Sequence, residues 1–320
     1  MKSAIVTGAT GFIGSWLVNE LLKQNIDVLA LGRKPLEEVD PHRRNLIKKA
    51  RYLQIDMSDM TSLPSRIASL NQSWDVLYNL AWGGATILSD LNVDKQLNNV
   101  AWSNDTFIAA SKLGIKKFIH IGTMEEAFAY RYLHLNHRED KYYNRHVVYA
   151  LAKGISKLSL RTIAPQYPDI DLLFATNSHV MGPFDDKDSF LQVTLQKLVN
   201  GTELIFSAGT QMFDVISVHD CVSAYIALGH EGHKGNDYWI GSGQPRRLKE
   251  YVLEMAELYP SEQPFQFGKL AYNDISLKVE DFDTSLLLNH TSFRHQWTYA
   301  DCVRELHDWI ILGKYTSISS

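Results

Sequence analysis

A glycine-rich turn close to the start of the sequence constrains the fold more than any other feature. Residues 3–6 form an apolar run, and residues 7–14 read Thr-Gly-Ala-Thr-Gly-Phe-Ile-Gly before an apolar helical pattern begins. Gly8 permits a tight turn after the strand, Gly11 lets the backbone approach a pyrophosphate, and Gly14 lets the helix pack closely on the sheet. The start of that helix offers unpaired N–H donors and the positive end of the helix dipole. The order of strand, glycine turn and helix therefore predicts a dinucleotide site rather than an ordinary turn.

Strand and helix patterns alternate through the first half of the chain, which is typical of βαβ units and a parallel sheet. A length of 320 residues allows one doubly wound sheet with a small additional lobe. The sequence therefore predicts an α/β fold with a Rossmann-type doubly wound parallel sheet and a smaller C-terminal lobe. After the first strand, we expect strands over residues 27–32, 52–55, 74–78, 117–121 and 170–175.

Composition limits the classes of partner. Hydrophobic residues make up 45% of the chain, charged residues 21%, and the net charge is −4, which is ordinary for a globular protein. The absence of a long Lys/Arg run argues against nucleic acid and against a polybasic membrane patch. Only two cysteines occur and the N-terminus leads directly into a strand, so we expect a cytoplasmic protein without disulfides or a membrane partner.

The glycine spacing G-x-x-G-x-x-G resembles that of the extended branch of the short-chain dehydrogenase/reductase superfamily. That branch holds the nucleotide-sugar epimerases, dehydratases and reductases. The resemblance implies a homodimer built on long helices, one of which we expect to end at Gly114. It also implies two parts: a dinucleotide-binding domain over residues 1–176, to which residues 213–241 return, and a substrate-binding lobe over residues 177–212 and 242–320.

The end of the second strand bears on the choice of cofactor. An acidic residue at this place binds the ribose 2′-hydroxyl of NAD, whereas a basic residue accommodates the 2′-phosphate of NADP. Here the strand ends in Arg33 and Lys34, with no acidic residue before Glu37. The sequence therefore favours NADP. NAD stays open as the alternative, because strand ends often carry a charge that meets only solvent.

The resemblance implies further cofactor contacts. Asp56 and then Met57 follow the third strand, where the family contacts adenine with an acidic residue. Leu80 and Ala81 match the family's small-residue loop along the diphosphate and ribose. The remaining implied contacts lie in the glycine turn, the same loop and the long helix: Thr10, Phe12, Ile13, Trp82 and Asn99. A structural role for Asn99 is the alternative, since an amide among apolar neighbours must find hydrogen-bond partners.

A tyrosine and a lysine one helical turn apart carry the predicted chemistry. Tyr149 and Lys153 share one face of a helix, and a nearby ammonium lowers the pKa of a phenol from its value of about 10 in water. Thr123 follows the fifth strand, at the edge where open α/β sheets bind ligands. Together the three resemble the superfamily's Ser/Thr, Tyr and Lys triad. The resemblance implies that Lys153 holds the nicotinamide ribose and polarises Tyr149. It also implies that Thr123 binds the reacting oxygen while Tyr149 moves the proton.

The residues after Thr123 indicate which reaction is catalysed. The 4,6-dehydratases of the family that this chain resembles carry Thr-Asp-Glu here. Their Asp and Glu act as acid and base in the elimination of water. This chain reads Thr-Met-Glu over residues 123–125, and methionine neither donates nor accepts a proton usefully. Dehydration is therefore disfavoured. Glu125 is a candidate for orienting the substrate, and Glu126 is interpreted as a solvated loop charge.

The second half offers candidate substrate contacts. Asn177 precedes a Gly-Pro pair and resembles the family's asparagine that meets the substrate's diphosphate. The arginine that commonly grips this diphosphate falls on Phe213, the first residue of a run over residues 213–220 that resembles the family's strand at this place. Arg247, with Arg246 beside it, is a candidate to compensate. No metal site is proposed. The other expected substrate contacts are Trp82, Thr123 and Glu125.

These observations favour an NADP-dependent reductase that acts on the C4 keto group of a nucleoside-diphosphate 4-keto-6-deoxyhexose. A net reductant is usually NADPH, and Met124 replaces the dehydratase acid. The alternative is a nucleotide-sugar 4-epimerase with tightly bound NAD, which uses the same triad and against which Arg33 argues modestly. A non-catalytic dinucleotide sensor is the third hypothesis, and the retained Tyr149 and Lys153 disfavour it.

Overall fold

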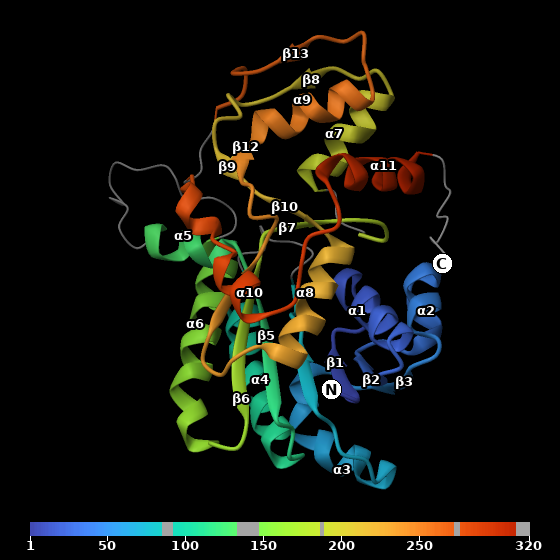
Figure 1. Cartoon of the computed structure of the whole chain (residues 1–320), viewed down its shortest axis with the longest axis vertical. Coiled ribbons are helices and arrows are strands. Elements are labelled where there is room, and N and C mark those ends of the chain that lie inside the picture. The colour runs from blue at the N-terminus through green and yellow to red at the C-terminus, as the bar shows by residue number, and fades with distance from the viewer. Residues whose placement is uncertain (85–91, 133–146, 186–188, 272–275, 312–320) are drawn as a thin grey trace.

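The centre of the protein is a parallel sheet of seven strands in the order β11-β6-β5-β4-β1-β2-β3 (Figure 1). The order reverses beside β1, so the predicted doubly wound Rossmann-type sheet is confirmed. The computed structural model describes five stretches of the chain: residues 1–84, 92–132, 147–185, 189–271 and 276–311. The sheet strands are β1 (Ser3–Thr7), β2 (Asp27–Gly32), β3 (Arg51–Gln54), β4 (Val76–Asn79), β5 (Lys117–Thr123), β6 (Asp171–Asn177) and β11 (Asp237–Ile240).

Helices cover both faces of this sheet (Figure 1). One face packs against α1 (Phe12–Lys23), α2 (Pro41–Ile47), α8 (Val218–Glu231) and α10 (Ser285–His290). The other face packs against α3 (Leu63–Ile67), α4 (Val93–Lys112) and α6 (Val147–Ile163). Short 3₁₀ turns occupy Leu36–Glu38, Met57–Ser62, Ala68–Leu70, Ala164–Gln166 and Val279–Phe282.

Alternate side chains of each strand enter two different cores. Ile5 of β1 packs in one cluster with Phe107 of α4 and Leu160 of α6. Its neighbour Val6 packs in the other cluster, with Leu17 of α1. Both faces are therefore apolar, as expected for a covered parallel sheet. The carboxyl ends of the strands remain as the edge at which polar side chains gather.

A smaller group of helices and two-stranded sheets lies beyond those carboxyl ends, in the upper part of Figure 1. The strand pairs are β7 (His179–Met181) with β10 (Val215–Ser217), β9 (Met212–Phe213) with β12 (Arg246–Arg247), and β8 (Leu204–Ile205) with β13 (Phe265–Gln266). The helices are α5 (Glu125–Tyr132), α7 (Phe190–Val199), α9 (Leu248–Leu258) and α11 (Tyr299–Ile310).

The single strand expected over residues 213–220 is wrong in its extent. It is divided into β9 and β10 by Asp214, and Val218 already begins α8 because the Ser217 hydroxyl accepts the Asp220 N–H as a helix cap. The carboxylate of Asp214 accepts hydrogen bonds from Ser178 and Ser242, which lie in other turns. This buried acid therefore holds the junction together.

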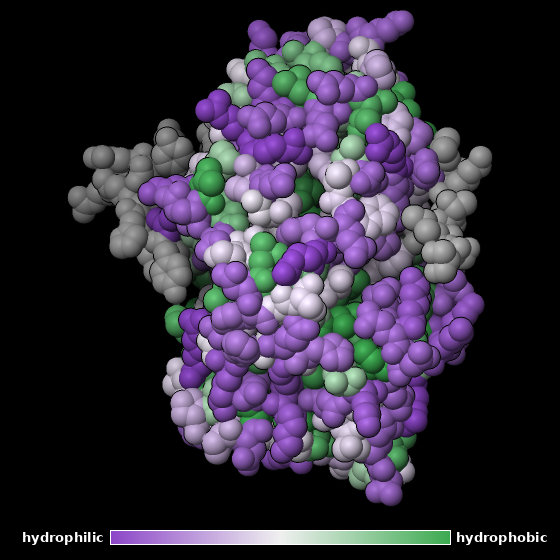
Figure 2. Space-filling view, viewed as in Figure 1, coloured by the Kyte–Doolittle hydropathy of each residue, from purple (hydrophilic) through white to green (hydrophobic). Residues whose placement is uncertain are grey.

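The face drawn in Figure 2 carries mostly hydrophilic side chains, with apolar ones in small separate groups. In the part of the chain that the structure describes, no helix is both long and apolar enough to span a membrane. Four large apolar side chains on α4 and α6 are 46–51% exposed: Val93, Leu97, Ile155 and Leu158.

Candidate active site

The glycine turn forms a cradle that no larger residue could line. Gly8 has a φ of +67°, and a Cβ there would lie 2.9 Å from the Ala81 nitrogen. A Cβ on Gly14 would collide with the Gly8 carbonyl oxygen. Gly11 is the N-cap of α1 and, as a glycine, offers the first N–H groups of that helix no side-chain acceptor. A cradle of backbone donors at a helix N-terminus fits the pyrophosphate of a dinucleotide. Around it, Thr10, Phe12 and Ile13 are partly exposed.

Two exposed basic residues end β2 next to this cradle. Arg33 and Lys34 are solvent-exposed, while their main-chain carbonyls accept hydrogen bonds from the side chains of Gln54 and Tyr52. The backbone is therefore fixed and the charged side chains reach solvent. Hydrogen bonds from Ser58, helped by the charge of Arg33, lower the pKa of Asp56, which keeps this carboxylate ionised.

The loop after β4 is held from two sides. The Ala81 N–H donates to the Thr7 hydroxyl at 3.1 Å. Asn99 of α4 is fully buried and bonds both main-chain groups of Gly83, accepting at 2.6 Å and donating at 2.9 Å. Asn99 therefore supports the loop from behind, which agrees with its alternative structural role. Its direct contact with a cofactor stays a prediction, as do those of Met57, Leu80 and Ala81, which are partly exposed.

Trp82 lies against two of the predicted catalytic residues. Its indole N–H donates to Gln96 at 2.8 Å, which fixes the ring. The Lys153 ammonium lies 4.1 Å from the ring centroid, a cation–π distance. The Tyr149 ring meets Trp82 edge-on, with centroids 6.3 Å apart. The structure thus brings Trp82, Tyr149 and Lys153 together.

Thr123, at the end of β5, completes the group. Its hydroxyl acts on the Tyr149 phenol, whose pKa it lowers, and Lys153 donates to the Ile121 carbonyl at 3.0 Å. The expected lowering of the Tyr149 pKa is not found in this structure. Burial, followed by the charge of Glu125, raises the pKa of Tyr149, and the effect of the Thr123 hydroxyl opposes this only in part. The phenol is therefore held in its protonated form.

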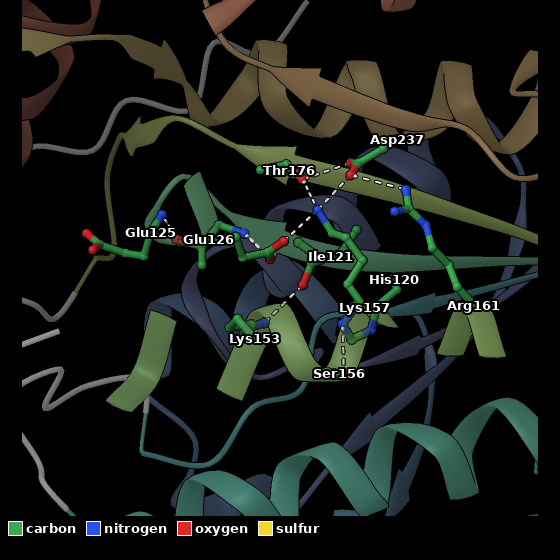
Figure 3. Close-up of polar contacts among 11 residues, drawn as sticks. His120, Ile121, Glu125, Glu126, Lys153, Ser156, Lys157, Arg161, Thr176 and Asp237 are labelled. Atoms are coloured by element: carbon green, nitrogen blue, oxygen red, sulfur yellow. Dashed lines mark hydrogen bonds and ion pairs between the residues drawn. The ribbon is translucent and has the colours of Figure 1, made fainter. Parts of the chain in front are cut away.

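The interpretation of Glu126 as a solvated charge is wrong. Its side chain is 6% exposed, and Oε1 accepts the Thr123 N–H at 2.9 Å. Its other oxygen lies 2.5 Å from the Lys157 ammonium, as Figure 3 shows. Sequence reasoning missed Lys157 too. The available signal was its position one helical turn after Lys153, on the same face of α6.

A second series of linked polar side chains lies buried beneath the site. Asn79 accepts from the Thr7 hydroxyl at 2.9 Å and contacts His120 Nδ1 at 3.1 Å, and Ser156 contacts the other ring nitrogen. Burial, together with the charges of Lys153 and Lys157, holds the pKa of His120 well below its usual value. The ring is therefore neutral. These polar residues also escaped sequence reasoning, because a strand pattern does not reveal which side chains meet.

The residues next to Thr123 differ in environment. Met124 packs with an apolar cluster that includes Phe128, Leu277 and Phe282. Glu125 is partly buried, and its charge acts on Tyr149. The position that carries an acid in dehydratases is thus part of an apolar contact, whereas Glu125 lies near the phenol.

The candidate substrate contacts are dispersed. The Asn177 carboxamide oxygen accepts from the Tyr225 hydroxyl at 2.7 Å, inside the protein. Arg246 pairs with Glu254 at 2.5 Å and stacks on Tyr251. Arg247 is exposed. The contacts of Asn177 and Arg247 with a substrate therefore stay predictions.

Register separates the two arginines. In the antiparallel pair of β9 and β12, Arg246 lies opposite Phe213, and Arg247 opposite Met212. Directly opposed residues share a face of the sheet. Met212 packs in the same apolar cluster as Met124, so Arg247 lies on the face toward the Thr123 loop. Arg246 lies on the face toward α9.

Comparison with known proteins supplies the family context. The family model described as NAD dependent epimerase/dehydratase family matches residues 4–241. A CDP-abequose synthase of Salmonella muenchen is 22% identical over 288 residues, covering 89% of this chain and 90% of that protein. A dTDP-4-dehydro-6-deoxyglucose reductase of Escherichia coli is 23% identical and covers 78% of this chain and 80% of its own length.

Solved structures agree on the fold. A UDP-N-acetylglucosamine 4-epimerase from Methanobrevibacter ruminantium, in complex with UDP-N-acetylmuramic acid, superposes with a TM-score of 0.77. It is 21% identical in sequence, and the match covers 98% of this chain and 99% of that one. At this identity the similarity establishes the architecture alone.

Proposed function

The chain belongs to the NAD-dependent epimerase/dehydratase family, and we propose that it is a nucleotide-sugar-modifying enzyme with the chemistry of a reductase. Its substrate is the C4 keto group of a nucleoside-diphosphate 4-keto-6-deoxyhexose, and its cofactor is NADP. The support from relatives is that a CDP-abequose synthase and a dTDP-4-dehydro-6-deoxyglucose reductase match most of this chain.

The observation that carries the proposal is the environment of Tyr149. The phenol is buried beside Thr123, and burial raises its pKa so that it stays protonated, which is the form that a general acid requires. Beside it, Met124 lies in an apolar cluster and offers no acid for the elimination of water. A protonated donor without that acid fits carbonyl reduction better than dehydration.

The chemistry follows from these residues. The reduced dinucleotide, when bound along the glycine cradle, supplies the hydride that reaches C4. Tyr149 gives its proton to the carbonyl oxygen, which becomes the hydroxyl of the product, and solvent later returns a proton to the phenolate. Thr123 orients both oxygens by hydrogen bonding. Lys153 lies on the same face of α6 as Tyr149. It stabilises the phenolate and binds the ribose.

The choice of NADP rests on β2. Arg33 and Lys34 end this strand with exposed side chains and fixed backbones, next to the glycine cradle. Two cations there accommodate a 2′-phosphate, and no carboxylate stands in their place to bind a 2′-hydroxyl.

A homodimer is part of the proposal. Val93 and Leu97 of α4, with Ile155 and Leu158 of α6, expose large apolar side chains. The two helices pack side by side, so this surface is continuous enough for the same two helices of a second copy, in an isologous contact.

The test offers NADPH or NADH to the purified protein with a panel of nucleoside-diphosphate 4-keto-6-deoxy sugars and follows absorbance at the reduced-nicotinamide band. Consumption of NADPH with one sugar is the expected result. Nucleoside-diphosphate sugars with a C4 hydroxyl are offered in parallel. Inversion of one of them at C4 without net consumption of dinucleotide, and with bound NAD released on denaturation, would replace the reductase by a 4-epimerase. Cofactor binding without turnover of any sugar would favour a sensor.

A further inference from the structure

Glu126 sits in a space built for its carboxylate. It belongs to the first turn of α5, yet its side chain turns back toward β5 and is almost fully buried. A Cβ on Gly122 would lie only 2.5 Å from Glu126 Oε1. The glycine therefore leaves room for the carboxylate directly beneath the end of the strand.

The carboxylate is bonded to the main chain that carries Thr123. Oε1 accepts the Thr123 N–H at 2.9 Å. On the opposite side, the next N–H, of Met124, donates to the Asn177 carbonyl of β6 at 2.7 Å. The strand end is thus fixed by β6 on one side and by Glu126 on the other, which sets the direction of the Thr123 hydroxyl.

Lys157 holds the carboxylate in place. Its ammonium contacts Glu126 Oε2 at 2.5 Å, Asp237 Oδ2 at 2.7 Å and the Thr176 hydroxyl at 2.9 Å, as Figure 3 shows. Both carboxylates raise the pKa of Lys157, against the effect of burial. Arg161 lies 3.6 Å from Asp237, so two cations balance two anions.

We propose that Glu126 is a positioning residue: its carboxylate, held by Lys157, fixes the Thr123 backbone and so aligns the Thr123 hydroxyl with Tyr149. This inference rests on the proposed function, in which these two hydroxyls act on the substrate oxygen. The geometry supports it because a buried side-chain oxygen that accepts one main-chain N–H restrains the direction of that N–H more strongly than a solvent-exposed contact would.

The structure offers matched variants. Glu126→Gln keeps an oxygen for the Thr123 N–H, whereas Glu126→Ala removes it. Arg161→Met is the control, because Arg161 belongs to the same charge cluster and its described contacts are with Asp237 and the Phe174 ring rather than with Glu126. If Glu126→Ala does not fold, the double variant Glu126→Leu with Lys157→Leu removes the same acceptor without leaving a buried charge unpaired.

The experiment measures kcat and KM for hydride transfer in the full-length chain. We expect Glu126→Ala, or the double variant, to lower kcat about 10- to 100-fold with KM within about threefold of wild type. Glu126→Gln and Arg161→Met should retain kcat within about threefold. Equal losses in Glu126→Gln and Glu126→Ala, or wild-type kcat in a folded Glu126→Ala, would overturn the inference.

A second measurement needs no substrate and separates this inference from the proposed function. Hydrogen exchange of the Thr123 amide should accelerate in Glu126→Ala or the double variant and stay slow in Glu126→Gln. If the wild-type chain turns over no sugar, the proposed function fails while this result still reports on the contact. Unchanged exchange in both Glu126→Ala and the double variant would show that the carboxylate does not fix Thr123.

Discussion

The two sides of the candidate site are built differently. On the catalytic side, Thr123 follows a central strand and Tyr149 and Lys153 share one helix face, so the main chain alone brings them together. On the substrate side, Asn177 is bonded to Tyr225 and Arg246 to Glu254. Residues at strand ends and on one helix face lie where the sequence pattern predicts them. Residues in short strand pairs form contacts that no sequence pattern predicts.

This difference has a functional consequence. Hydrogen bonds that link β5 with Glu126 of α5 and with Lys153 of α6 fix the proposed catalytic side, so it tolerates little change in geometry. The substrate side relies on two-residue strands and an exposed arginine, which can vary without disturbing the core. Specificity for one sugar nucleotide can therefore diverge while the chemistry stays constant.

The largest expected effect on activity comes from removing the proposed proton donor. Tyr149→Phe removes the proton donor and should lower kcat about 1,000-fold, while melting temperature and dinucleotide affinity change little, because the ring and its contact with Trp82 remain. The wild-type reduction rate should also stay constant from pH 7 to about 9, because the raised pKa of Tyr149 keeps the acid protonated as pH increases. A Tyr149→Phe variant with more than a tenth of the activity would refute the assigned role.

Cofactor choice gives the next largest effect. Arg33→Ser should weaken NADPH binding about 10- to 100-fold and leave NADH binding nearly unchanged, since only the first carries the 2′-phosphate. Lys48→Ser, a change of a cation in the loop after α2, is the control. Equal losses of affinity for NADPH and for NADH would show that Arg33 does not bind the 2′-phosphate.

On the substrate side we expect smaller effects, which differ between Arg247 and Arg246. Arg247→Met should raise KM for the sugar nucleotide about tenfold with little change in melting temperature, because Arg247 faces the Thr123 loop from an exposed position. Arg246→Met should leave KM unchanged and lower the melting temperature by about 3 °C, because it removes the partner of Glu254. The reverse assignment of effects would mean that Arg246 contacts the substrate.

Sequence alone predicted the doubly wound sheet and the grouping of Tyr149 with Lys153, because both follow from residue spacing. It misjudged Glu126, since an acid three residues after a strand looks like any loop charge. Burial of that acid depends on Gly122 and Lys157, which come from other elements. It also expected a lowered Tyr149 pKa from the nearby lysine, whereas burial dominates in the folded chain.

The smallest expected effect tests the support beneath the catalytic side. The folded state depresses the pKa of His120, so it binds fewer protons than the unfolded chain as pH falls below about 6.5. Stability should therefore be full above that pH and decline by up to about 1.4 kcal/mol per pH unit below it. His120→Asn should flatten this slope in urea unfolding between pH 7 and 5, and the exposed His42→Asn should not. An unchanged slope in His120→Asn would contradict the neutral buried ring.

The most direct test of the central claim follows the hydride itself. The enzyme is given NADPH deuterated at C4 of the nicotinamide together with the nucleoside-diphosphate 4-keto-6-deoxy sugar that supports turnover, and the product is examined by mass spectrometry and NMR. The account predicts one deuterium at C4 of the sugar for each NADPH consumed, and almost none of this transfer in Tyr149→Phe. No deuterium at C4 and no NADPH consumed, with inversion at C4 of the matching nucleotide sugar that carries a C4 hydroxyl, would contradict it and identify an epimerase.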